Sequence, residues 1–231
     1  MPDSSDKQFR RRSPRVPNPG LRGDHLPKIV IEFGARRVHD RNLYLPLESA
    51  GGGIIRRKDA HRIITFADQK GFDLLEGIAP WLAEQNVSLV ALGSGQKKFE
   101  DMFRELAASR PEKFVVRIGY DDALAHRIEA GSDMFLMPSQ YEPCGLNQMY
   151  SLRYGTVPVV RATGGLDDTV DDETGFKFRE YTPEALTAAI RDALKAFMDA
   201  DQWLVRMRKG MAKDFSWNAS AQAYQRLYKS L

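Results

Sequence analysis

Six short apolar runs divide the chain after residue 60 into a regular series. Each run is nearly continuous in hydrophobic residues and is bounded by glycine, proline or charged residues, which predicts a strand that is buried on both faces. The runs cover residues 62–67, 87–93, 114–120, 133–139, 157–162 and 175–178.

The segments between and after these runs are amphipathic. In 71–85, for example, Phe72, Leu74, Leu75, Ile78 and Leu82 recur at near-helical spacing. Similar spacing predicts helices over residues 97–110, 122–131, 145–155, 182–198 and 214–231. In the helix 182–198, the first residue is a threonine, which is a good N-cap, and a proline follows in the first turn.

Strands that alternate with helices of this length predict βαβ units with right-handed crossovers and a mostly parallel sheet. The expected fold class is therefore α/β, with a doubly wound, Rossmann-like sheet covered by helices on both faces. In such sheets, ligands bind outside the carboxyl ends of the strands.

Residues 1–60 show no comparable periodicity. They are rich in arginine, proline and glycine, four arginines fall within residues 8–15, and "KIVIEF" (28–33) is the one stretch with the composition of a short strand. We therefore expect a poorly ordered basic N-terminal region over 1–60 and one folded domain over 61–231. Because no aromatic residues are interleaved with the arginines for base stacking, this region is interpreted as solvated, and no nucleic-acid partner is expected.

The composition is that of a globular protein: 42% of the 231 residues are hydrophobic, 28% are charged, and the formal net charge is +3. A single cysteine excludes an internal disulfide and a multi-cysteine metal site, and the four histidines form no HxxxH or HxH pair. No metal or other cofactor is expected. Because no apolar run approaches the roughly 20 residues of a membrane span and no secretory signal is present, we expect a cytoplasmic location and no membrane partner.

Four features follow predicted strands and would lie at one edge of the sheet. They are the loop "PSQYEPCGLNQ" (138–148), the turn "GSG" (93–95), Tyr120, and the turn "ATGGL" (162–166). Glycines let backbone N–H groups approach an anion, and a helix expected to begin at Leu166 or Asp167 favours negative charge at its start. This coincidence predicts a ligand site at the carboxyl edge.

Some side chains at this edge carry candidate chemistry. Lys70, at a strand-to-helix junction, is either solvated or reaches a diphosphate. Tyr120 either stacks on a base or caps its strand. Glu142 can accept hydrogen bonds from sugar hydroxyls. Cys144 is interpreted as a small buried apolar side chain rather than a nucleophile, because no histidine is placed in the sequence to activate it.

Taken together, these stretches resemble bacterial glycogen synthase and plant starch synthase, the glucosyltransferases that use ADP-glucose. The resembling text begins near Asp68 and includes "DQKGFDLL" (68–75), "LGSG" (92–95), "RIGYDDALAHRIEAGSDMFLMPSQYEPCGLNQMYSLRYGTVPVVRATGGLDDTV" (117–170), "TGFKF" (174–178) and "DFSW" (214–217). Its long central run is far more specific than a lone glycine motif. The resemblance implies the carboxy-terminal half of a two-domain GT-B glycosyltransferase.

The resemblance also implies roles for individual residues. Glu142 would be the catalytic acid that holds the donor glucose. The nucleotide-sugar-binding positions would be Lys70 at the diphosphate, Tyr120 at the adenine, and a turn with the start of a helix near sugar and phosphate, formed by Cys144, Gly145, Leu146, Asn147 and Gln148.

The implied reaction transfers glucose from ADP-glucose to the non-reducing end of an α-1,4-glucan and retains the anomeric configuration. ADP-glucose, ADP and the glucan acceptor are the expected partners.

The chain departs from the family in three places. Residues 1–60 do not resemble the family's amino-terminal domain with its KTGGL motif, Thr65 stands where the family has an arginine, and the loop before Thr174 is several residues shorter. We therefore expect a truncated or frame-disrupted synthase with little activity alone. Two alternatives stay open: a non-catalytic ADP- or ADP-glucose-binding module, and half of a split synthase that assembles with a separately encoded amino-terminal domain. A sugar-nucleotide epimerase would share the two-domain architecture, but the text "EPCGL" (142–146) speaks against it.

Overall fold

The protein folds around a six-stranded parallel sheet with the strand order β3-β2-β1-β4-β5-β6. The computed structural model describes residues 27–33 and 66–231. The strands are β1 Lys28–Phe33, β2 Ser88–Gly93, β3 Phe114–Ile118, β4 Met134–Met137, β5 Val157–Arg161 and β6 Phe176–Phe178. The order reverses between β1 and β4, so the doubly wound α/β fold predicted from the sequence is confirmed, with its switch point at these two strands.

The central strand comes from the region before residue 61. β1 pairs with β2 on one side and β4 on the other, which confirms the short strand expected at 28–33 and includes it in the domain. The strand expected over 62–67 lies mostly outside the described residues, and its Phe66 forms a single parallel bridge to Gly95. The rest of the 1–60 region, with its arginines, and Thr65 also lie outside the described residues.

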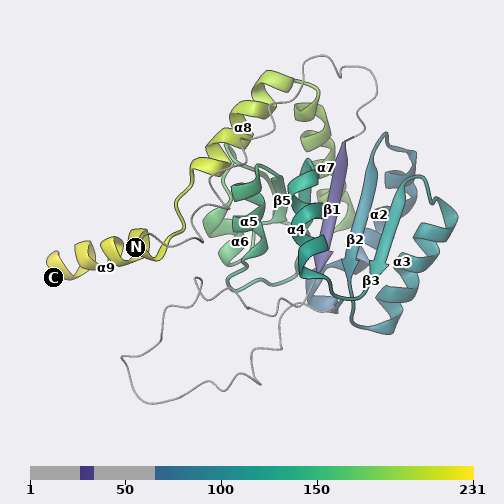
Figure 1. Cartoon of the computed structure of the whole chain (residues 1–231), viewed down its shortest axis with the longest axis horizontal. Coiled ribbons are helices and arrows are strands. Elements are labelled where there is room, and N and C mark those ends of the chain that lie inside the picture. The colour runs from purple at the N-terminus through teal and green to yellow at the C-terminus, as the bar shows by residue number, and fades with distance from the viewer. Residues whose placement is uncertain (1–26, 34–65) are drawn as a thin grey trace, which may run out of the picture.

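Helices cover both faces of the sheet (Figure 1). They are the short 3₁₀ helix η1 Asp68–Lys70, then α2 Phe72–Glu84, α3 Lys97–Ser109, α4 Asp122–Gly131, α5 Asn147–Tyr154, α6 Gly165–Thr169, α7 Pro183–Phe197, α8 Ala200–Ala212 and α9 Trp217–Lys229. Helices α2, α3 and α7 pack on one face, and α4, α5 and α6 pack on the other. The Thr182 hydroxyl accepts a hydrogen bond from the Ala185 N–H at 3.2 Å, as its N-cap position predicts.

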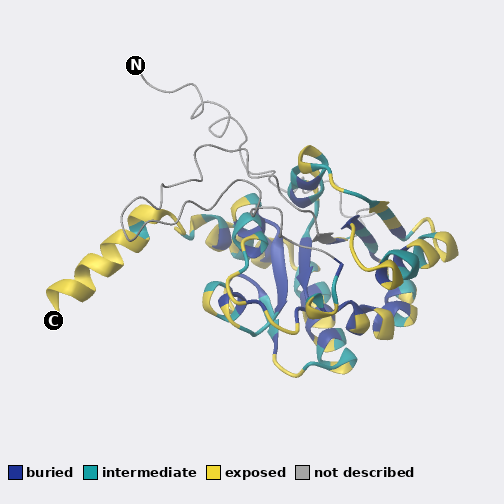
Figure 2. Cartoon of the chain, turned by 90° about the horizontal axis from the view of Figure 1, so that it is seen from below, coloured by how far each residue is buried: buried dark blue, intermediate teal, exposed yellow. Residues whose placement is uncertain are grey.

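Alternation along the strands divides the core into two layers. Ile29 and Leu136 belong to the cluster under α2, α3 and α7, whereas Val30 and Phe135 belong to the cluster under α4 and α6. Strands β4 and β5 are accordingly buried on both faces, as the dark strands at the centre of Figure 2 show, whereas the edge strand β3 exposes Val115 and Arg117. Each fully buried side chain of this kind contributes about 1.5–3 kcal/mol to folding, so the sheet is a rigid platform for its edge.

The sequence pattern did not predict α8. Its N-cap Asp199 accepts a hydrogen bond from the Gln202 N–H at 3.1 Å, and Trp203 is buried beside Phe176 and Phe197. The helix then reaches α5, where Gly210 leaves room for Leu152. Helix α8 therefore joins the layer of α7 to the layer of α5.

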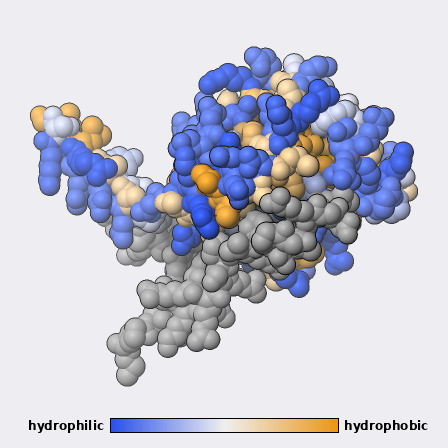
Figure 3. Space-filling view, turned by 90° about the horizontal axis from the view of Figure 1, so that it is seen from above, coloured by the Kyte–Doolittle hydropathy of each residue, from blue (hydrophilic) through white to orange (hydrophobic). Residues whose placement is uncertain are grey.

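Helix α9 confirms the helix expected near the end of the chain, but it projects from the body of the domain (Figures 1 and 3). None of its residues is buried, and Trp217, Tyr224, Leu227 and Tyr228 are exposed apolar side chains along it. Within the described residues, no helix has both the length and the apolar character needed to cross a membrane.

Candidate functional site

The side chains of Lys70 and Glu142 meet outside the carboxyl ends of β1 and β4. Phe66 continues the line of β1, because Phe33 pairs with Gly93 and Phe66 with Gly95, and η1 carries the chain on to Lys70. Lys70 and Glu142 form an ion pair in which the two side chains are 12% and 11% exposed. The pair therefore lies at the switch point of the sheet, where a doubly wound fold offers a crevice for a ligand.

A close approach of two backbones places Lys70 against the loop 138–148. Gly71 has a left-handed φ of 76°, and a Cβ at this position would lie 2.0 Å from the Pro138 carbonyl oxygen. Beside it, the Gln69 side chain donates to the Tyr141 carbonyl, and the Gln140 N–H donates to the Gln69 carbonyl, both at 2.8 Å. Only glycine fits at residue 71, so this position fixes the separation of Lys70 and Glu142.

The turn between β5 and α6 holds Glu142 from the opposite side. The Gly165 N–H donates to the Glu142 carbonyl at 3.0 Å. A Cβ on Gly164 would lie 2.2 Å from that carbonyl oxygen, and a Cβ on Gly165 would lie 1.9 Å from the Cys144 carbonyl oxygen. Helix α6 begins at Gly165, just before the expected start at Leu166 or Asp167. These two glycines allow backbone contact with the loop and leave no room for a side chain.

Gln148 turns its side chain back into the same loop. The residue is fully buried, and its Nε2 donates to the carbonyl oxygens of Cys144 and Gly145, each at 3.1 Å. The side-chain amide of Gln148, a predicted ligand-binding residue, therefore already makes its hydrogen bonds within the loop. A ligand at this position would meet the backbone of α5 instead.

The remaining predicted positions in the loop lie at the surface. Leu146 is exposed, and the first residue of α5, Asn147, is half-buried. The expectation that Cys144 is buried is wrong, because its side chain is exposed. The turn packs the Cys144 carbonyl against Gly165 and Gln148, and its side chain is left at the surface.

Tyr120 lies at the same edge, beyond the carboxyl end of β3 and separated from β1 by β2. The residue is 38% exposed, and its hydroxyl donates to the Asp122 carboxylate at 3.2 Å. The turn at 93–95 lies between, and its Ser94 carbonyl accepts a hydrogen bond from the Phe66 N–H at 2.9 Å. All four features predicted to share one edge of the sheet do so, because every strand is parallel.

Further polar contacts link the loop 138–148 to β5 and α2, and the sequence alone did not single out the residues that make them. The Arg161 guanidinium donates to the Gln140 carbonyl at 2.6 Å and lies over the Tyr181 ring at 5.4 Å. The Tyr181 hydroxyl donates to Asp73 at 2.6 Å. Burial and this hydrogen bond to Asp73 raise the pKa of the Tyr181 phenol above its ordinary range. No local motif marks these residues, because each contact joins segments that are distant in sequence.

Charge at the start of η1 is balanced by α3. Lys98 forms an ion pair with Asp68, and Gln96 donates to the same carboxylate at 3.2 Å. The bond from Lys98, followed by that from Gln96, lowers the pKa of the Asp68 carboxyl. Among the residues that the structure describes, no cluster of three or more histidine, cysteine, aspartate or glutamate side chains is arranged to hold a metal ion.

Residues 62–206 match the family of glycosyl transferases group 1. The chain belongs to this family. It is 57% identical to a glycogen synthase of Koribacter versatilis over 171 residues, which cover 71% of this chain and 35% of that protein. It is 53% identical to a glycogen synthase of Anaeromyxobacter dehalogenans over 226 residues, which cover 95% of this chain and 45% of that protein.

Solved structures agree with the fold. The catalytic domain of Starch Synthase IV from Arabidopsis thaliana, bound to ADP and acarbose, is similar with a TM-score of 0.67 and 26% identity over 90% of this chain and 39% of that chain. A sucrose-phosphate synthase from Thermosynechococcus elongatus shares the fold with a TM-score of 0.57 and 20% identity, over 89% of this chain and 46% of that chain. The described domain thus has the fold of the carboxy-terminal half of a GT-B glycosyltransferase and is of the glycogen and starch synthase type.

The similarity also reaches upstream of the expected limit near Asp68. An alignment that covers 95% of the chain includes most of residues 1–60, so the match to this relative does not begin near Asp68, as expected, but further upstream. The chain spans 35–45% of the length of the two glycogen synthases described.

Proposed function

We propose that this chain supplies the donor-binding half of a retaining glucosyltransferase that moves glucose from ADP-glucose to the non-reducing end of an α-1,4-glucan. The observation that carries the proposal is the Lys70–Glu142 ion pair at the switch point of the sheet, enclosed by backbone contacts at Gly71, Gly164 and Gly165. The glycogen synthase relatives support the reaction, and the starch synthase structure bound to ADP supports the nucleotide.

In this proposal, Lys70 neutralises charge on the diphosphate as the bond to the anomeric carbon breaks. The N-terminus of α5 adds the positive end of a helix dipole near the leaving group. Glu142 gives up its contact with Lys70 and accepts hydrogen bonds from hydroxyl groups of the donor glucose, for which a carboxylate is a strong acceptor. The acceptor oxygen bonds to the anomeric carbon on the face from which ADP leaves, and the acceptor proton passes to the departing phosphate oxygen. This same-face geometry retains the configuration.

Tyr120 completes the nucleotide site in this proposal by stacking on the adenine. An exposed aromatic ring at the carboxyl edge can give such stacking about 1–3 kcal/mol. Gly145, Leu146 and Asn147 would present backbone amides to sugar and phosphate, with Cys144 as part of the turn.

The acceptor glucan must be held opposite the donor, and positioning of this kind can supply about 7–11 kcal/mol of barrier lowering. We therefore expect little turnover from these 231 residues alone. A matching amino-terminal domain, supplied separately, should raise the rate.

The test is incorporation of ¹⁴C-glucose from ADP-glucose into glycogen. The purified chain is assayed with and without the amino-terminal part of the Koribacter versatilis glycogen synthase. Incorporation that depends on Glu142 supports the proposal. Binding of ADP-glucose without incorporation in either mixture would instead identify a non-catalytic binding module, and transfer from UDP-glucose alone would overturn the choice of donor.

A further inference from the structure

A small hydrogen-bond network behind the loop 138–148 links it to α6 and α8. Its central residue is Thr169, the last residue of α6. The Thr169 hydroxyl accepts a hydrogen bond from Gln148 Nε2 at 3.1 Å and donates to the Gly165 carbonyl. One hydroxyl therefore contacts both halves of the candidate site, the loop through Gln148 and the glycine turn through Gly165.

The Gln148 amide has two N–H protons for three acceptors, the Cys144 and Gly145 carbonyls and the Thr169 hydroxyl, so one proton is shared between two of them. A threonine hydroxyl has one proton to donate, and Thr169 uses it on Gly165, so its lone pair remains for the Gln148 amide. Rotating that amide would turn its oxygen toward the Cys144 and Gly145 carbonyls and break both bonds. Its own oxygen is buried without a partner among the described residues, so the donor contacts alone hold the side chain.

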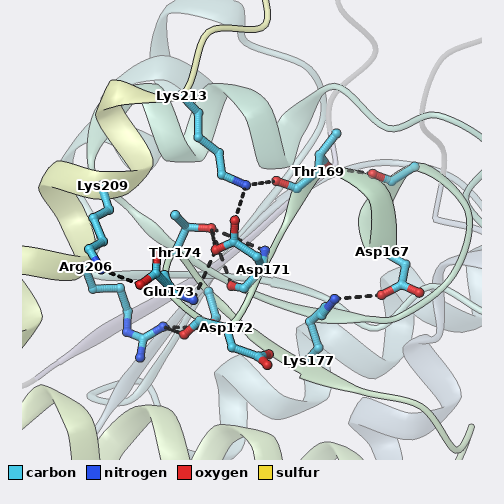
Figure 4. Close-up of polar contacts among 12 residues, drawn as sticks. Asp167, Thr169, Asp171, Asp172, Glu173, Thr174, Lys177, Arg206, Lys209 and Lys213 are labelled. Atoms are coloured by element: carbon cyan, nitrogen blue, oxygen red, sulfur yellow. Dashed lines mark hydrogen bonds and ion pairs between the residues drawn. The ribbon is translucent and has the colours of Figure 1, made fainter.

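Thr169 is anchored in turn by α8. The Lys213 ammonium, at the end of that helix, donates to the Thr169 carbonyl at 2.8 Å and forms an ion pair with Asp171 at 2.6 Å (Figure 4). Two basic residues of α8 contact the turn 171–175 that follows α6. Arg206 donates to the Gly175 carbonyl at 2.9 Å, and Lys209 pairs with Glu173 at 2.6 Å. The end of α6 is therefore fixed independently of the loop it supports.

We infer that Thr169 is a positioning residue for Glu142, acting through Gln148 and Gly165. The Gly165 N–H donates to the Glu142 carbonyl and, at 3.3 Å, to the Pro143 carbonyl. Gln148 donates to the carbonyls of the next two residues, Cys144 and Gly145. Loss of the Thr169 hydroxyl removes its hydrogen bonds to Gln148 and to Gly165 at once, and so loosens both supports of the loop. The consequence for ADP-glucose binding rests on the proposed function, whereas the consequence for loop order does not.

The matched variants are Thr169→Val, which keeps the shape and removes the hydroxyl, and Thr169→Ser, which restores the hydroxyl. Thr187→Val, on α7, is the control for the chemical change itself. Hydrogen exchange of the Gly165 amide, followed by NMR at fixed pH, reports its bonds to the Glu142 and Pro143 carbonyls. We expect exchange at least tenfold faster in Thr169→Val, within about twofold of wild type in Thr169→Ser, and unchanged in Thr187→Val.

Ligand titrations separate positioning from general loosening. In Thr169→Val, the affinity for ADP-glucose should fall about tenfold while that for ADP changes less than about twofold. An unchanged Gly165 exchange rate, or equal losses for both ligands, would overturn the inference. If the wild-type chain binds neither ligand, the proposed function fails and the exchange measurement still decides on Thr169. If Thr169→Val does not fold, Lys213→Met should speed Gly165 exchange about threefold, and no change there would overturn the inference.

Discussion

Lys70 and Glu142 are 72 residues apart in the sequence and form a largely buried ion pair where the strand order of the sheet reverses. Glu142 follows β4, and Lys70 follows Phe66, which lies in line with β1. Gly71, Gly164 and Gly165 allow the close backbone contacts that hold the loop carrying Glu142. A lysine and a carboxylate held in this way can separate to meet a phosphate and a sugar without moving the fold.

Removing the charge of Glu142 should act on both function and stability. In Glu142→Gln, the affinity for ADP-glucose should fall about tenfold while that for ADP changes little, because the carboxylate is proposed to contact only the sugar. The free energy of unfolding should fall by about 1–3 kcal/mol, since Lys70 loses its charged partner. Calorimetry and urea unfolding measure the two effects.

The control for this variant is Glu173→Gln. Glu173 also pairs with a lysine, but its side chain is 70% exposed. Its loss should cost no more than about 1 kcal/mol and leave both ligand affinities unchanged. Equal effects of the two variants would show that the Glu142 contact has no special role.

Gly165→Ala should disrupt the backbone contact between α6 and the loop 138–148. The added methyl group would lie 1.9 Å from the Cys144 carbonyl oxygen, so either the loop or α6 must shift. We expect a loss of about 1–3 kcal/mol in unfolding free energy, together with loss of ADP-glucose binding. Gly131→Ala is the control, since its methyl group meets nothing within 4 Å and should be neutral or slightly stabilising.

Tyr120→Ala should weaken ADP binding by about 1–3 kcal/mol and barely change stability, because the residue is 38% exposed. Tyr120→Phe should retain the affinity, since stacking needs the ring and not the hydroxyl. Calorimetric titration with ADP tests both variants. If the alanine variant binds ADP as well as wild type, adenine is not held by this ring.

We expect the ion pair between Asp171 and Lys213, in the turn beneath α8, to make the protein less stable in acid. Burial raises the pKa of the Asp171 carboxyl, but the bonds from Lys213 and Thr174 outweigh it and bring the pKa below its ordinary value of 3.8. A lowered pKa in the folded state adds stability above the unfolded-state pKa, and this stability is lost as the pH falls below about 4.

Urea unfolding between pH 3 and 7 measures this effect. Asp171→Asn and Lys213→Met should each flatten the decline below about pH 4, and the double variant should add little to either. Because the Asp171 side chain is 51% exposed, the contribution should stay below about 1 kcal/mol. A decline as steep in both variants as in wild type would place the acid sensitivity elsewhere.

Local pattern was sufficient to predict most of the elements. The strands β2 to β6 are nearly continuous apolar runs, and α7 carries its N-cap in the sequence, so each matches its expected range closely. Helix α8 was missed because its apolar residues Trp203, Val205, Met207 and Met211 are interleaved with charged ones. The central position of β1 was also not predictable, because a short apolar strand gives no local sign of which strands will pair with it.

In the candidate site, too, some features could be predicted from the sequence and others could not. Parallel strands placed Lys70, Tyr120 and Glu142 at one edge, as expected from the order of elements alone. The inward turn of Gln148 and the exposure of Cys144 depend on how the loop packs against the glycine turn, and no periodicity records such contacts. The roles of these residues toward a ligand stay predictions.

Whether the switch point of the sheet binds a nucleotide sugar is decided by calorimetric titration of the purified chain with ADP-glucose and with ADP. The account predicts saturable binding of both ligands by the wild type, about tenfold weaker binding of both by Lys70→Met, and unchanged binding by Lys209→Met, a surface lysine that also pairs with a carboxylate. Absence of saturable binding by the wild type, or undiminished binding by Lys70→Met, would contradict the claim that the switch point of this sheet is a nucleotide-sugar site.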